Sequence, residues 1–79
     1  MRILDESTDQ SITNVTLYLT LSEAIEMLDS LPALITGPLN NHSHISSDDH
    51  QKEITVCVYD RENLNGFSER SKNLIINDL

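Results

Sequence analysis

All three histidines of the chain fall in one short polar stretch, beside two adjacent acidic residues. Residues 40–50 read NNHSHISSDDH, which contains His42, His44, Asp48, Asp49 and His50. Imidazole and carboxylate groups are common Zn²⁺ ligands, and imidazole also changes its charge near neutral pH. The stretch therefore fits three roles: a metal site, a proton switch or the polar turn of a β-hairpin.

The strand that follows this stretch indicates which way the histidines point. Residues 52–60, KEITVCVYD, alternate in the manner of a β-strand. Its aliphatic residues on one side are Ile54, Val56 and Val58. If residues 42–46 form the preceding strand, Ile45 is their one large apolar side chain. Burying it contributes about 1.5 to 3 kcal/mol, whereas burying two imidazoles without partners costs a comparable amount each. We therefore expect Ile45 to point inward and the histidines outward.

One hairpin register meets this requirement. It makes three cross-strand pairs: Ser46 with Gln51, His44 with Glu53, and His42 with Thr55. A slip by one residue would reverse every side chain. Two histidines on one strand with a carboxylate opposite could supply three ligands, so the predicted metal site is His42, His44 and Glu53. The other histidine, His50, and the adjacent acids are expected to hold the turn, because Asp bonds its own backbone well.

The same outward face carries side chains that suit contact with another protein. They are Tyr18, Thr55, Cys57 and Tyr59, and we predict that they form an interaction surface. Catalysis is the weaker interpretation, because a single helix on a small sheet leaves little room for a site that excludes water. We therefore expect a chain that is not an enzyme and has no cofactor.

Composition excludes several classes of partner. The net charge is −8, and residues 1–50 hold eight acids against Arg2 alone. Binding to nucleic acid needs clustered Lys and Arg, so neither nucleic acid nor an anionic membrane is expected as a partner. The opening residues turn acidic where a signal peptide would need an apolar run, and the lone Cys57 fits a reducing compartment. We expect a cytoplasmic protein.

The first half of the chain predicts a strand followed by a helix. Residues 11–20, SITNVTLYLT, alternate in polarity and indicate a half-buried strand, to which the opening RIL could pair. Thr20 and Glu23 then have the spacing of a capping box. The apolar stripe of the helix that begins there consists of Leu21, Ala24, Ile25, Leu28 and Leu31. We expect this stripe to lie on the sheet, with a stop or kink before Pro32 and the last helical turn ending at Gly37.

Together these elements predict one small α+β domain over residues 1–79. Its two layers are an antiparallel sheet of three or four strands and one main helix across a single face of that sheet. A short C-terminal element closes the fold, as a helix starting after Ser68 or as a last strand at NLIINDL. The expected core comprises Val15, Leu17, Leu19, Ile25, Leu28, Ile54, Val56 and Val58.

Three segments together resemble a group of short uncharacterised bacterial proteins. They are NVTLYLTLSEAIEMLDSL, EITVCVYDRENLNGF and SERSKNLI. The group often has a denser histidine run where this chain has Asn41, His42, Ser43 and His44. The resemblance implies a single small bacterial domain and carries no activity with it.

The functional prediction is a protein-interaction or regulatory module that associates with itself. A chain of 79 residues buries only about 60% of the surface that its unfolded form exposes, so a second copy is the simplest source of added burial. We therefore expect a homodimer, formed through the open face or an edge of the sheet. The alternative is a metal-binding protein that uses His42, His44 and Glu53.

Overall fold

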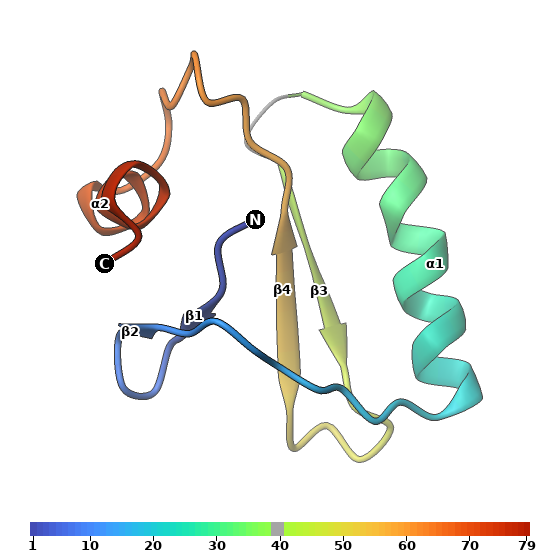
Figure 1. Cartoon of the computed structure of the whole chain (residues 1–79). Helices are drawn as coiled ribbons and strands as arrows, with labels where there is room; N and C mark the ends of the chain where they lie inside the picture. The colour runs from blue at the N-terminus through green and yellow to red at the C-terminus, as the bar shows by residue number, and fades with distance from the viewer. Residues whose placement is uncertain (39–40) are drawn as a thin grey trace.

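Over the residues that the structure describes, the fold is a small α+β structure with two helices and two separate two-stranded antiparallel sheets (Figure 1). The computed structural model describes residues 1–38 and 41–79. Its elements in chain order are β1 (Leu4–Asp5), β2 (Gln10–Ser11), α1 (Leu21–Thr36), β3 (His42–Ser46), β4 (Glu53–Cys57) and α2 (Glu69–Asn77).

Helix α1 begins at the predicted capping box. The Thr20 side chain accepts the Glu23 N–H at 3.2 Å, and Glu23 Oε1 accepts the Thr20 N–H at 2.8 Å. The helix runs through Pro32 and ends at Thr36, with Gly37 as its cap. A Cβ at Gly37 would lie 2.6 Å from the Ala33 carbonyl oxygen, so this close approach requires glycine.

The β3–β4 hairpin has the predicted facing but a different register. Ser46 lies opposite Glu53 instead of Gln51, so the pairing is shifted by two residues. Because side chains alternate with a period of two, this shift leaves every residue on its predicted side. Ile45 lies opposite Ile54 and is only 2% exposed, while His42 and His44 are exposed.

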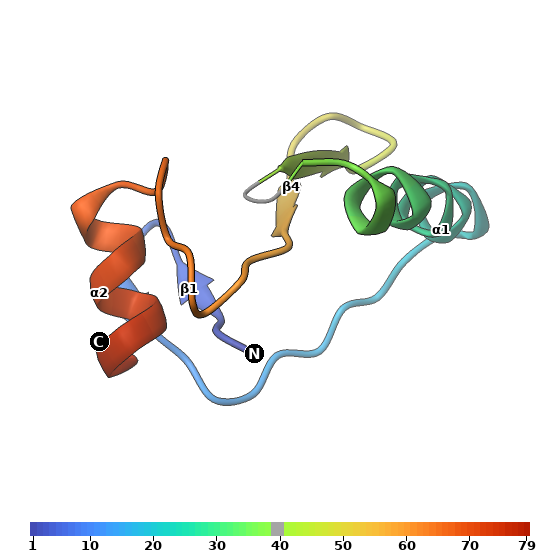
Figure 2. The ribbon, with the colours of Figure 1, turned by 90° about the horizontal axis from the view of Figure 1, so that it is seen from above.

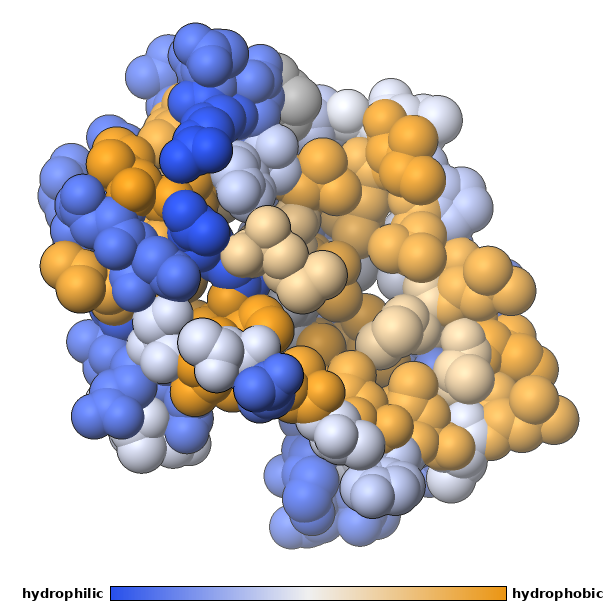
Figure 3. Space-filling view, in the orientation of Figure 1, coloured by the Kyte–Doolittle hydropathy of each residue, from blue (hydrophilic) through white to orange (hydrophobic). Residues whose placement is uncertain are grey.

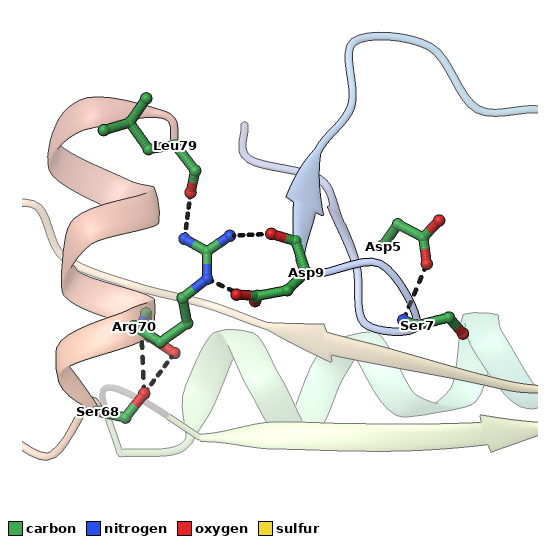
Figure 4. A network of polar contacts seen from close by, with 7 residues as sticks. Asp5, Ser7, Asp9, Ser68, Arg70 and Leu79 are labelled. Carbon is green, nitrogen blue, oxygen red and sulfur yellow. Dashed lines mark hydrogen bonds and ion pairs between the residues drawn. The ribbon is translucent and has the colours of Figure 1, made fainter.

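The N-terminal strands and α2 form the other half of the molecule. Arg2 Nε donates to the carbonyl oxygens of Leu74 and Ile75, both at 3.1 Å. Arg70 reaches from α2 to the β1–β2 turn, where its Nε donates to Asp9 Oδ1 at 2.6 Å, and its Nη1 donates to the Leu79 carbonyl (Figure 4). Two arginines therefore fix α2 to the β1–β2 hairpin. The helical alternative for the C-terminal element is confirmed, with Ser68 as its N-cap.

The expected single sheet of three or four strands is not confirmed. Residues 12–20 are not a strand: they run from β2 to α1 as an extended trace (Figure 1), and the view in Figure 2 shows this trace apart from β4. Both ends of this segment are held in place. Ile12 N–H bonds to the Ile3 carbonyl at 3.0 Å, and Thr20 Oγ1 donates to Asp48 Oδ2 at 2.7 Å. These bonds fix one end of the segment to Ile3, just before β1, and the other end to the turn between β3 and β4.

The predicted direction of the α1 stripe is wrong. Leu21 is 78% exposed and Leu28 is 65% exposed, whereas the buried residues of α1 are Glu23 and Leu34. The reason is a tertiary hydrogen bond, in which Glu23 Oε2 accepts the Asp48 N–H at 2.8 Å. Since 3.6 residues make one turn, turning Glu23 toward the hairpin turns the centre of the stripe about 140° away from it.

The expected common core is therefore not formed. Its members Val15, Leu17, Leu19, Ile25 and Leu28 are all exposed, and Ile54, Val56 and Val58 are half-buried. Among the described residues, the buried aliphatic side chains are Leu34 and Ile45 in one half, and Leu74 and Ile75 in the other. Two small clusters thus stand in place of one core.

The molecule is open for its size. Its accessible surface is 6056 Å². A compact monomer of 8.9 kDa exposes about 4,800 Å². The Cα radius of gyration is 13.3 Å, against about 11.6 Å for a compact chain of 79 residues. The excess surface is therefore about 1,250 Å².

Candidate functional site

The most distinctive surface of this molecule is a set of uncovered aliphatic side chains, here called the apolar face. It comprises Val15, Leu17, Leu19, Leu21, Ile25, Leu28, Leu31 and Ile35, all exposed. On α1 the members recur at intervals of three and four residues, which aligns them along one side of the helix. Figure 3 shows apolar residues gathered over α1 and across the middle of the molecule. Monomeric proteins rarely expose large contiguous apolar patches, so this face is a candidate interaction site.

A groove of about 600 Å³ runs between residues 16–19 and the β3–β4 hairpin, and it lies beside the apolar face. Leu17 and Leu19 form one wall, while Ile45 and Ile54 belong to the opposite wall. Glu23 also borders this groove, but its two carboxylate oxygens are engaged by the Thr20 and Asp48 N–H groups. The groove can therefore accept an apolar side chain or a short extended segment.

The residues predicted as an interaction surface are divided between two grooves. Tyr18 is 92% exposed and borders the groove just described. Thr55, Cys57 and Tyr59 line a second groove of about 620 Å³, together with residues from β1 and α2. These four residues therefore do not form one flat patch. The sequence showed the apolar stripe of α1, but we expected it to be buried on the sheet, whereas the structure leaves it exposed as part of the apolar face.

The Cys57 thiol lies at the end of β4 and borders the second groove. Partial burial raises the pKa of this thiol above its ordinary value of 9.0, and the nearby Glu6 carboxylate raises the pKa further. Both causes disfavour the thiolate, because one removes water from the charge and the other places a negative charge nearby. Cys57 is therefore a protonated, weakly nucleophilic side chain at neutral pH.

The predicted metal ligands lie on the exposed side of the hairpin. His44 Nδ1 is 2.5 Å from Glu53 Oε1 and 2.9 Å from Thr55 Oγ1. The ring centroids of His42 and His44 are 5.0 Å apart, in an edge-to-face arrangement. Within residues 1–38 and 41–79, no group of three or more His, Cys, Asp or Glu side chains is placed to hold a metal ion. The structure thus pairs His44 with Glu53 and leaves His42 as a ring neighbour.

The two acidic residues of the β3–β4 turn, Asp48 and Asp49, stabilise the local structure. Asp48 accepts from the Thr20 hydroxyl at 2.7 Å and from the Ser22 hydroxyl at 2.9 Å. Asp49 accepts from the Ser47 hydroxyl at 2.6 Å, and this bond is the main reason why the pKa of Asp49 is lowered. Asp48 therefore joins the hairpin to the start of α1, while Asp49 stabilises the turn itself. Asn40, which opens the stretch, lies outside the described residues.

No protein-family model, curated protein or solved structure matches the chain. Among the described residues, no helix is both long enough and apolar enough to cross a membrane.

Proposed function

We propose that the chain is a non-enzymatic protein-interaction module that associates with itself through the apolar face. The observation that carries this proposal is the exposure of an aliphatic stripe along α1, next to a groove with aliphatic walls. Water contact with such a surface is unfavourable by about 25 cal/mol for each Å². A chain that keeps so many aliphatic side chains uncovered gains free energy when a partner covers them.

The amount of uncovered surface fits a second copy. If each copy loses its excess of about 1,250 Å², the dimer buries about 2,500 Å² in total. Obligate homodimers bury about 2,000 to 5,000 Å² and have interfaces that resemble half of a domain core. A two-fold contact also needs only one self-complementary surface, which the apolar face supplies.

The charge of −8 opposes association at low ionic strength but does not prevent it. Charges separated by more than about 8 Å are largely screened at physiological salt. On α1, Glu26 lies on the side away from the centre of the stripe, since it follows Ile25 by one residue and so by about 100°. We therefore expect the dimer to strengthen as salt is added.

Two substitutions on α1 test the proposal. Leu28→Glu places a carboxylate in the apolar face, whereas Ala33→Glu places the same group on the far side of the same helix, where the residue is also exposed. Losing the burial of one Leu on each side costs about 3 to 6 kcal/mol, so Leu28→Glu should weaken dimerisation at least about a hundredfold. Ala33→Glu should leave it unchanged. Light scattering at micromolar concentration measures both, and equal masses for the two variants would contradict the proposal.

A further inference from the structure

One edge of β4 is open. Two backbone hydrogen bonds show which residue pairs of the hairpin are hydrogen-bonded. Ser47 N–H bonds to the Lys52 carbonyl at 2.9 Å, and Val58 N–H bonds to the Asn41 carbonyl at 3.4 Å. Because hydrogen-bonded and non-hydrogen-bonded pairs alternate, Ile54 and Val56 direct their backbone groups toward β3. The residues that direct theirs toward the open edge are Glu53, Thr55 and Cys57. In the part of the chain that the structure describes, no strand occupies this edge.

Residues 13–19 have the pattern of a strand without a partner. They read TNVTLYL, with alternating apolar and polar side chains. No backbone hydrogen bond joins them to any other described residue. An extended segment of this kind readily adds to an exposed sheet edge, where main-chain hydrogen bonds give the affinity.

Within one copy this segment does not reach β4. Ile12 bonds one end to Ile3, and Thr20 bonds the other end to Asp48 in the β3–β4 turn. Between these ends, the groove of about 600 Å³ separates residues 16–19 from Ile54. Figure 2 shows the segment passing well away from the hairpin. The open edge and the unpaired segment are thus both present in one chain but held apart.

We infer that residues 13–19 of a second copy pair with the open edge of β4, and that the reciprocal pairing completes both sheets. This inference rests on the self-association proposed above. It places Val15, Leu17 and Leu19 of the incoming strand on the side of Ile45 and Ile54, where the groove has aliphatic walls. Thr16 and Tyr18 then share the outward side with Thr55 and Cys57. Each face of the completed sheet is matched in polarity.

Cross-linking between differently tagged chains tests the pairing. One chain keeps Cys57 as its single cysteine, and the other carries Cys57→Ser with Thr16→Cys. A short bismaleimide joins two thiols over a range of distances, so the result does not depend on the exact register of the two strands. The expected product is a covalent dimer that contains both tags. A matched control, Cys57→Ser with Glu26→Cys, places the thiol on an exposed position of α1 away from β4 and should give little product.

Amide exchange adds a second readout. Pairing should slow exchange at Thr55 and Cys57 by more than about tenfold when the chain concentration is raised from mostly monomer to mostly dimer. A dimeric mass with no cross-link above the control and no protection at these amides would overturn the strand pairing and leave the proposed function standing. A monomeric mass at every concentration would overturn both. Protection that does not depend on concentration would assign the pairing to a single copy and would also overturn the inference.

Discussion

The substitution Glu23→Gln tests how the orientation of α1 is fixed. Glu23 is 8% exposed, and its two oxygens accept the N–H groups of Thr20 and Asp48, each at 2.8 Å. Glutamine has the same shape but only one accepting oxygen, so one of the two N–H groups loses its partner. An unsatisfied buried donor costs about 1 to 3 kcal/mol, and loss of the negative charge at the helix N-terminus adds about 0.3 to 1 kcal/mol.

A destabilisation of about 2 kcal/mol lowers the melting temperature of a domain this small by about 8 to 16 °C. Thermal unfolding followed by circular dichroism, at a fixed chain concentration, measures the change. The matched control is Glu26→Gln, which makes the same chemical change at an exposed position three residues further along the same helix. Its expected effect is within about 0.5 kcal/mol. If Glu23→Gln melts like Glu26→Gln, the Glu23 contacts do not determine how α1 is turned.

Three further predictions address other parts of the molecule. Leu34 is 2% exposed, so Leu34→Ala should cost about 2 to 5 kcal/mol in urea unfolding, and a smaller loss would mean that the cluster around it is not a core. The raised pKa of Cys57 means that the thiolate forms only at high pH. The rate of alkylation by iodoacetamide, followed against pH in the folded chain, should therefore have its midpoint above pH 9.0. A midpoint at or below that value would refute the raised pKa. The metal-binding alternative stays a prediction. Zn²⁺ at 100 times its dissociation constant would add about 2.7 kcal/mol of stability, and His44→Asn should abolish this gain. An unchanged melting temperature of the parent chain on adding Zn²⁺ would remove the alternative.

Local signals in the sequence predicted local structure well. The capping box at Thr20 and Glu23 starts α1, Gly37 ends it, and Ser68 starts α2. Each of these signals acts through backbone groups within one helical turn, so the surrounding fold hardly affects it. The facing of Ile45 was predictable for a similar reason, because only one side of that strand carries a large apolar group.

Tertiary contacts account for what the sequence did not predict. The hairpin register differs from the predicted one by two residues because the Ser47 hydroxyl accepts the N–H groups of Gln51 and Lys52, at 3.1 and 2.9 Å. A hydrophobic pattern with a period of two residues is the same in both registers, so the sequence could not distinguish them. The rotation of α1 depends on Glu23 bonding to Asp48, which is 25 residues away in the sequence. A capping residue is normally placed on the solvent side, so nothing local indicated that this one turns inward.

The strand pattern of residues 13–19 was recognised, but its partner was assigned to the same copy. The structure holds this segment apart from its own sheet, and the alternation alone cannot tell a strand that pairs within one chain from a strand that pairs with another. The same pattern therefore supports the pairing between copies inferred above.

Sedimentation equilibrium of the parent chain shows whether the apolar face of one copy stays uncovered or is covered by a second copy. At micromolar concentration and physiological salt, we expect a mass of twice 8.9 kDa. We also expect the dissociation constant to rise when the salt is lowered, because acidic copies then repel more strongly. A mass of 8.9 kDa at both low and physiological salt would contradict the account.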